Sequence, residues 1–209
     1  MSDTVTVDAG SFADWLRAMQ AALAGDGGTD VPCGDCRGCC VSGYPVPIRP
    51  QDAPMRAAIP PGQLVASAGR EFMTARADGT CPMLVDRECS VYALRPQTCR
   101  DYDCRIFAAA GIDAGGPARS VINERIRAWR FRYRDDAERA LHDAVRAAAR
   151  FLATKGDRFP FGIAPTSPSG IAVTALAVCD LFLAPGAAGR DDAATVAAIR
   201  KRLQRPSNS

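Results

Sequence analysis

Eight of the nine cysteines of this 209-residue chain lie between Cys33 and Cys104, and this cluster restricts the fold more than any other feature. Two thiolates separated by two residues can point at one ion from a tight turn, and thiolates suit zinc, copper(I) and iron–sulfur centres. His142 is the sole histidine, so mixed cysteine and histidine zinc sites are largely excluded. We therefore expect nearly all-thiolate ligation of a metal ion or cluster. The predicted metal and cofactor ligands are Cys33, Cys36, Cys39, Cys40, Cys81, Cys89, Cys99 and Cys104.

The rest of the sequence favours metal ligation over disulfides. The first residues contain Asp3 and Asp8 and lack the basic and apolar regions of a secretory signal, so we expect a cytoplasmic protein with reduced thiols. A chain of this length with 47% hydrophobic residues buries a core without disulfides. The longest apolar stretch, residues 171–184, is interrupted by Asp180 and predicts a buried helix rather than a membrane segment. Cys179 within it is a predicted core residue.

The spacing leaves the identity of the metal open. Cys33, Cys36 and Cys39 are spaced as in part of a bacterial ferredoxin motif, which would supply three ligands to an iron–sulfur cluster. Two four-thiolate zinc sites would also use eight cysteines. Adjacent Cys39 and Cys40 cannot easily bind one ion, so one of them serves a second centre or stays a free thiol. Thiol chemistry without metal is the third reading.

Hydrophobic spacing and turn residues predict the local structure. Apolar residues at three- and four-residue intervals predict an amphipathic helix from an N-cap at Ser11 to Gly25. Residues 50–58 favour a short helix, and residues 83–85 and 90–92 are predicted to form a small hairpin around residues 86–89. Residues 122–152 predict one long helix or two consecutive helices, with a break at Asp135 or Asp136, and residues 191–203 predict a final helix.

These elements give a chain that is mainly α with small irregular β. The predicted organisation is an N-terminal amphipathic helix in residues 1–30, a metal-organised cysteine-rich domain in residues 31–116 and a helical C-terminal region in residues 117–209.

The charged residues do not indicate a nucleic-acid partner. The formal net charge is only +3, and the arginines of residues 119–150 are interleaved with Asp and Glu, which favours a solvated, ion-paired helix surface. His142 lies between Leu141 and Asp143, so we predict a surface or half-buried histidine without a functional role.

The cysteine arrangement resembles the YkgJ-like cysteine-cluster family, the CxxCxxCC proteins described as zinc- or iron-chelating domains. The run CGDCRGCC, residues 33–40, is similar to the opening motif, and a second similar block follows. The resemblance extends from Val31 to Arg105 and implies metal chelation by these cysteines. Its second block contains Gly79, Cys81, Pro82, Leu84, Cys89, Val91, Tyr92, Arg95, Pro96, Cys99 and Arg100.

Two alternative functions stay open at this point. Enzymes resembling flagellin lysine methylase have a similar cysteine run, which implies an iron–sulfur redox or methyl-transfer role. The second alternative is a zinc-stabilised interaction module that presents the arginine-rich helix to a partner. The sequence has no GxGxxG fingerprint, no phosphate-binding GxxxxGK[ST] loop and no CxxxCxxC run, so we assign no catalytic residue and no protein partner.

Overall fold

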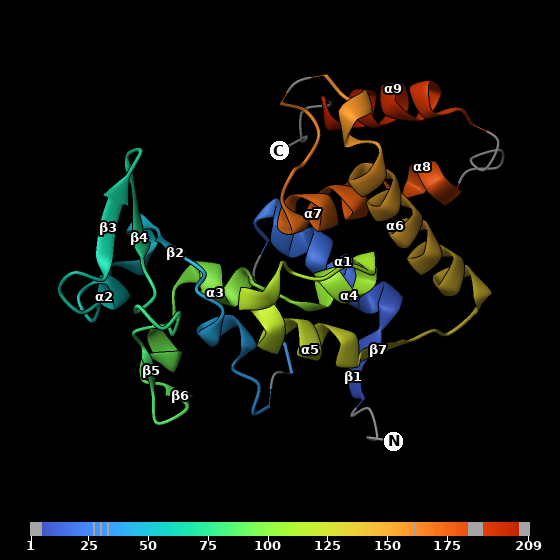
Figure 1. Ribbon diagram of the computed structural model, residues 1–209. Coiled ribbons are helices and arrows are strands. Elements are labelled where there is room, and N and C mark those ends of the chain that lie inside the picture. Colours follow the sequence, from blue (N-terminus) through green and yellow to red (C-terminus); the bar gives the residue numbers. More distant parts are fainter. Residues whose placement is uncertain are drawn as a thin grey trace. The chain divides into compact units, whose positions relative to one another are not determined.

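The structure is a computed structural model that describes residues 6–26, 28–29, 31–32, 34–160, 162–183 and 190–204. The described residues are mainly helical with small sheets, which confirms the predicted fold class (Figure 1). The chain forms two compact units from discontinuous segments. The helical unit consists of Met1–Gln20, Cys104–Ala114 and Ala128–Ser209, and the cysteine unit consists of Ala21–Asp103 and Gly115–Arg127.

The helical unit is built around helix α6, Asp136–Thr154. Asp135 caps this helix by accepting a hydrogen bond from the Glu138 amide at 2.8 Å. Its apolar face packs against α4 (Arg105–Ala110), α7 (Pro168–Val178) and α8 (Asp180–Leu183). The buried residues on this face include His142, Ala144, Val145, Ala148, Ala149 and Leu152.

The first and last described helices begin where their capping residues predict. Helix α1, Phe12–Ala24, starts after Ser11, whose hydroxyl accepts from the Asp14 amide, and the helix ends before Gly25, which has a φ of +95°. Helix α9, Asp192–Leu203, is capped by Asp191. Both predicted helices are confirmed.

A strand lies within the region for which we predicted one long helix or two consecutive helices. Helix α5 spans Ser120–Ala128, strand β7 spans Trp129–Arg132, and α6 follows. Strand β7 pairs in parallel with β1, Val7–Ser11. The prediction placed Trp129 on a helix face and was wrong there, because the alternating sequence WRFR suits a strand with one buried side.

The predicted apolar helix of residues 171–184 is divided by Cys179. Helix α7 ends at Val178, and α8 follows at Asp180. The Cys179 side chain is buried, and its thiol donates to the Leu176 carbonyl at 3.3 Å. The predicted core role of Cys179 is confirmed.

His142 is fully buried, so the prediction of a surface or half-buried residue was wrong. Its ring stacks on Phe12 with centroids 4.3 Å apart. Nδ1 lies 2.6 Å from the Tyr133 hydroxyl and Nε2 lies 3.0 Å from the Ala109 carbonyl. The Tyr133 hydroxyl can donate to Nδ1 while Nε2–H donates to the carbonyl, so the neutral ring satisfies both nitrogens. Burial, aided by the positive charge of Arg146, lowers the pKa of His142 to about 4.

This histidine should make the helical unit sensitive to acid. The unfolded chain gains a proton at His142 near pH 6.5, whereas the folded chain resists protonation until about pH 4. Stability is therefore fully present above pH 6.5 and falls as the pH drops through this window, by about 3 kcal/mol at most. Both tryptophans, Trp15 and Trp129, lie in the helical unit, so denaturation followed by tryptophan emission measures the loss. His142→Phe should flatten the pH dependence, and an equally steep dependence in that variant would contradict the assignment.

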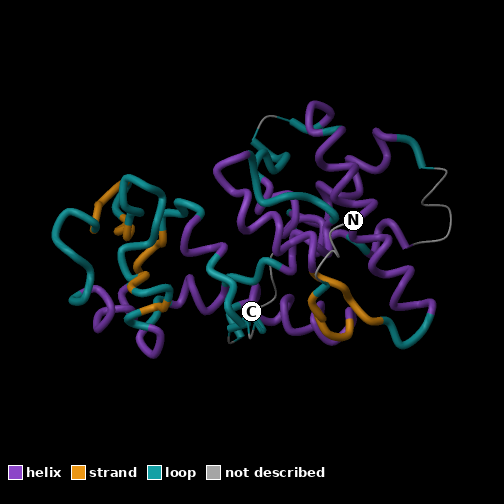
Figure 2. The backbone as a smooth tube through the Cα atoms, turned by 60° about the horizontal axis from the view of Figure 1, so that its bottom comes forward, coloured by secondary structure: helices purple, strands orange, loops and turns teal. Residues whose placement is uncertain are grey.

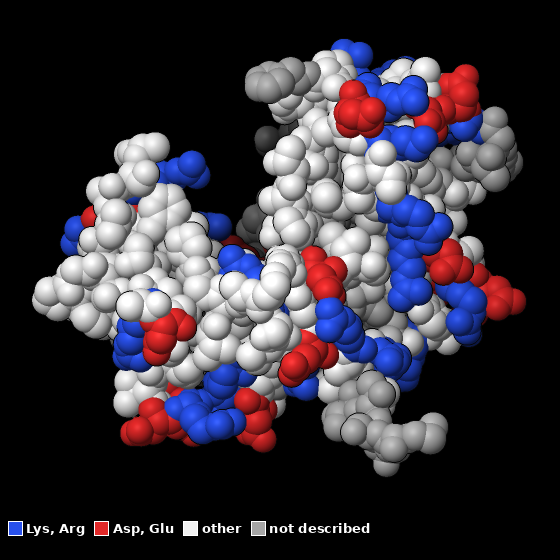
Figure 3. Space-filling model, viewed as in Figure 1, with Lys and Arg blue, Asp and Glu red and all other residues white. Residues whose placement is uncertain are grey.

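The charged surface over α6 and α9 carries opposite charges side by side (Figure 3). Lys155 pairs with Asp192 at 2.7 Å, and Arg202 pairs with Asp180 at 3.2 Å. Within the arginine-rich stretch of residues 119–150, Arg134 pairs with Glu138. This pair agrees with the ion-paired surface predicted for that stretch. Among the described helices, none is both long and apolar enough to cross a membrane.

The cysteine unit is made of short elements joined by loops (Figure 2). Its three-stranded antiparallel sheet has the order β2-β4-β3. A short helical segment, η2 (Pro50–Asp52) followed by α2 (Ala53–Arg56), confirms the helix predicted for residues 50–58. The strands are β2 (Val46–Ile48), β3 (Leu64–Ser67) and β4 (Arg70–Met73).

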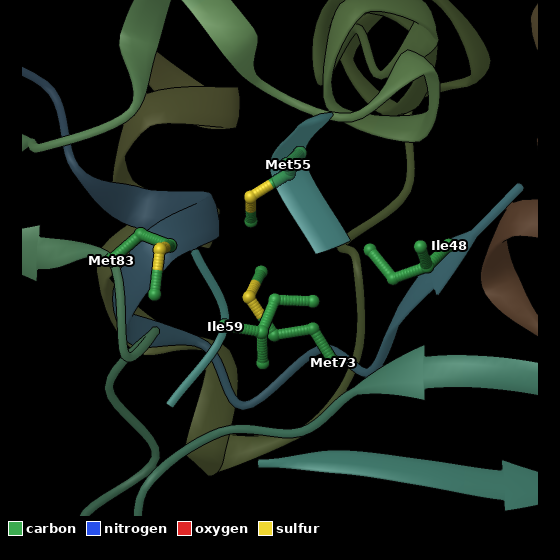
Figure 4. Packing of buried hydrophobic residues seen from close by; sticks show 5 residues of the cluster. All are labelled: Ile48, Met55, Ile59, Met73 and Met83. Atoms are coloured by element: carbon green, nitrogen blue, oxygen red, sulfur yellow. The ribbon is translucent and has the colours of Figure 1, made fainter. Parts of the chain in front are cut away.

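Three methionines dominate the small core of the cysteine unit. Met55, Met73 and Met83 pack with Ile48 and Ile59, and the ends of the Met55 and Met73 side chains point toward each other (Figure 4). Unbranched methionine adapts to an irregular space of this kind. Partly buried residues cover the cluster, namely Val46, Leu64, Cys81, Cys89 and Val91. The core therefore supports two of the predicted ligands directly.

Candidate metal centre

The first cysteine run ends in a tight 3-10 turn, η1, Gly38–Val41. The amides of Cys40 and Val41 both donate to the Arg37 carbonyl, at 2.9 and 3.1 Å. The turn brings the sulfur atoms of Cys39 and Cys40 to 3.8 Å from each other. Cys36 lies just before the turn and accepts a hydrogen bond from the Gly38 amide at 3.4 Å. The three described cysteines of this run therefore lie on one short loop.

Backbone hydrogen bonds join this loop to the segment that carries Cys81. The Cys81 amide donates to the Cys40 carbonyl at 2.7 Å, and the Gly43 amide donates to the Gly79 carbonyl at 2.9 Å. The guanidinium of Arg37 also donates to the Arg87 carbonyl in the next turn of the chain. These bonds fix Cys39 and Cys40 relative to the second group of cysteines.

Cys89 ends the hairpin formed by β5 (Leu84–Val85) and β6 (Glu88–Cys89). A hairpin was predicted here, but its second strand was wrongly expected at residues 90–92, with Cys89 in the loop. Cys89 pairs with Leu84 across the hairpin, so Cys81 and Cys89 flank the same short ribbon. The loop residues Asp86 and Arg87 have φ values of 48° and 65°. This backbone is that of a two-residue hairpin turn, in which the second loop residue is usually glycine.

The hairpin should become more stable when Arg87 is replaced by glycine. A left-handed conformation costs a non-glycine residue roughly 1 kcal/mol, and Arg87→Gly keeps the carbonyl that Arg37 contacts. We expect the free energy of unfolding of the cysteine unit to rise by about 1 kcal/mol in urea denaturation followed by tyrosine emission. Glu88→Gly, in the adjacent strand, is the control and should be destabilising. A lower stability of Arg87→Gly would contradict this account of the turn.

Cys99 lies in helix α3, Gln97–Asp101, which the surrounding chain holds from both ends. Buried Asp52 accepts from the Gln97 amide and from the Arg49 amide, each at 2.9 Å. Arg100 donates to the carbonyls of Arg95 and Ala93, at 3.2 and 2.8 Å. The helix that presents Cys99 is thereby tied to two separate loops.

The thiols of Cys39, Cys81, Cys89 and Cys99 are electrostatically coupled neighbours. Burial raises the pKa of Cys99 to about 12, and repulsion from negative charge on the other three adds to the effect. Burial likewise raises the pKa of Cys81, with repulsion from Cys89 and Cys39. A hydrogen bond with Cys40, together with burial, raises the pKa of the Cys39 thiol. The positive charge of Arg95, whose guanidinium lies 4.2 Å from the Tyr92 ring centroid, opposes the rise at Cys99.

These couplings describe a site that favours a bound cation. Thiolates that repel one another lose that repulsion when a positive ion lies among them, and a metal displaces their protons. A set of four thiols fits zinc or an iron–sulfur cluster. Within the described part of the chain, no three His, Cys, Asp or Glu side chains already stand where they could hold an ion. The four thiols are neighbours rather than a closed ligand cage.

The other predicted ligands have different surroundings. Cys33 lies outside the described residues. Cys36 and Cys40 lie on the first loop, as Cys39 does. Cys104 belongs to the helical unit, where it is buried and accepts a hydrogen bond from the Trp129 indole at 3.3 Å. The assignment of these four cysteines as ligands stays a prediction.

Several residues that hold the site were not identified from the sequence. Arg37, Arg76 and Arg100 donate to backbone carbonyls of the cysteine-bearing loops. Arg76, for example, donates to the carbonyls of Pro82 and Leu84. A loop rich in Gly and Pro has many carbonyls that lack a backbone partner. This composition is the only sequence signal that nearby arginines would donate to loop carbonyls.

The chain thus contains a cysteine-rich unit and a helical unit. Residues 32–117 match the model of the CxxCxxCC family, which is described as a "Putative zinc- or iron-chelating domain". The resemblance found in the sequence is thereby confirmed for this segment of the chain. No curated protein and no solved structure matched the chain.

Proposed function

We propose that this protein binds zinc or an iron–sulfur cluster through the thiolates of Cys39, Cys81, Cys89 and Cys99. The observation that carries the proposal is that backbone hydrogen bonds hold the loop of Cys39 and Cys40 against the segment of Cys81, which continues into the hairpin that ends at Cys89. Burial raises the pKa values of Cys81 and Cys99, and repulsion from the neighbouring thiols adds to this rise. The four residues come from four separate short elements or loops, which suits closure around a central ion. The description of the matching family as zinc- or iron-chelating supports the same chemistry.

The same four donors give different chemistry with the two cofactors. Zinc with four thiolates is a closed, structural site, and a four-cysteine iron–sulfur cluster can carry an electron. In either case the bound group would join η1, the hairpin and α3, and its binding energy would stabilise a unit with a small core. The described cysteines are free thiols, as thiolate ligation requires.

Metal and acid-labile sulfide analysis of anaerobically purified protein, with a visible spectrum, tests this proposal. Brown protein with iron and sulfide supports a cluster and a redox role. Colourless protein with one zinc per chain supports a structural centre. Protein that holds neither, and that takes up neither when reconstituted, would overturn the proposal.

A further inference from the structure

Helix α5 begins after the segment that matches the family, yet it lies directly against the first cysteine loop. A Cβ atom added to Gly38 would be 2.9 Å from the Cα of Ile122 and 3.1 Å from its Cβ. Such contacts are too short for any side chain, so the backbone of η1 rests on the backbone of α5. Ile122 is 1% exposed, which places this contact in the interior of the cysteine unit.

A second set of contacts holds the other end of the same turn. The guanidinium of Arg119, next to the start of α5, lies 3.6 Å from the centroid of the Tyr44 ring. It also donates to the Ser42 carbonyl, and the Ser42 hydroxyl donates to the Gly38 carbonyl. The Tyr44 ring in turn contacts the Tyr102 ring at 5.7 Å. The turn is therefore held against α5 on both sides of Cys39 and Cys40.

These contacts bear on the metal centre through the backbone of η1. A shift of Gly38 away from Ile122 would move Cys39, the next residue. It would also strain the bond between the Cys40 carbonyl and the Cys81 amide, which joins the two ligand-bearing segments. The remaining donors, Cys89 and Cys99, lie on elements tied elsewhere, so they would not follow the shift.

We propose that α5 supports the metal centre by packing against η1. Gly38 is a positioning residue, because its lack of a side chain lets α5 approach closely enough to place Cys39 among the other thiols. This inference rests on the proposed metal function and extends the functional unit beyond the family-matched residues. It predicts that metal affinity depends on residues that make no contact with the metal.

Competition between the protein and a chromogenic chelator for Zn²⁺ tests the inference. Gly38→Ala should weaken zinc binding by about 10- to 100-fold, as do changes in residues that orient metal ligands. Gly116→Ala is the matched control, because no atom lies within 4 Å of the added Cβ, and it should change the affinity less than about twofold. Arg119→Gln, which removes the contacts to Tyr44 and Ser42, should weaken binding by about tenfold. Wild-type affinity in both Gly38→Ala and Arg119→Gln would overturn the inference while leaving the metal function intact.

Amide hydrogen exchange of the wild-type protein gives a second measurement that does not depend on a variant folding. Saturation with Zn²⁺ should slow exchange in α5 at least about tenfold and leave α6, in the helical unit, unchanged. Slower exchange in η1 and α3 without any change in α5 would also overturn the inference. A wild-type protein that binds no zinc and no cluster would instead refute the proposed function.

Discussion

Replacing Cys99 with serine should abolish tight metal binding. Serine lacks the soft sulfur donor, and the other three thiols cannot complete a four-thiolate site. Changes in residues that only orient ligands cost about 10- to 100-fold in affinity, so loss of a ligand should exceed about 100-fold. Chelator competition measures the change. The position of Cys99 in α3, held by Asp52 and Arg100, makes a substitute ligand from the same helix hard to supply.

Cys179→Ala is the control for this experiment. Cys179 is buried in the helical unit and bonds to the Leu176 carbonyl, so its loss should lower stability slightly and leave the bound metal unchanged. Equal metal content in Cys99→Ser and wild type, with both folded by circular dichroism, would contradict the four-thiol assignment.

Removing the metal should open the cysteine unit and leave the helical unit folded. The buried core of the cysteine unit is a small cluster around Met55, Met73 and Met83, whereas the helical unit buries α6 against several helices. Ligation of a structural zinc contributes about 10 kcal/mol or more to small metal-dependent folds. The cysteine unit should therefore depend on the metal, while the helical unit keeps its own core.

Hydrogen exchange with and without a strong chelator measures this difference. Exchange in β2 and β4 should accelerate by more than about 100-fold, which corresponds to about 3 kcal/mol. Amides of α6 and the emission of Trp15 and Trp129 should stay unchanged. Uniform acceleration in both units would indicate one cooperative fold, and unchanged exchange everywhere would show that the metal is not structural.

Local signals in the sequence predicted the helices better than the sheets. Helices α1 and α9 begin directly after their capping residues Ser11 and Asp191, as predicted, because a capping side chain and an apolar period are both local properties. Strand β7 was missed because its partner, β1, lies more than a hundred residues away, at Val7–Ser11. Parallel pairing over that separation leaves only a short alternating pattern in the sequence. Four residues are too few to distinguish that pattern from part of a helix.

The same limit applies to the candidate site. Cysteine spacing predicted thiolate ligation, but it could not show that Cys39 lies near enough to repel Cys81 and Cys99, because this depends on the geometry of η1. The role of Gly38 depends on Ile122, which lies 84 residues further along the chain. The burial of His142 depends on a hydroxyl from Tyr133 and a carbonyl from Ala109, and neither can be read from the residues beside it.

Differential alkylation of the cysteines, read by mass spectrometry with and without a chelator, tests the central claim residue by residue. We expect Cys39, Cys81, Cys89 and Cys99 to react slowly with iodoacetamide in the metal-loaded protein and rapidly once the metal is removed, with Cys179 slow in both states. Equal reaction rates for these four cysteines with and without metal, or protection of a set that excludes them, would contradict the account.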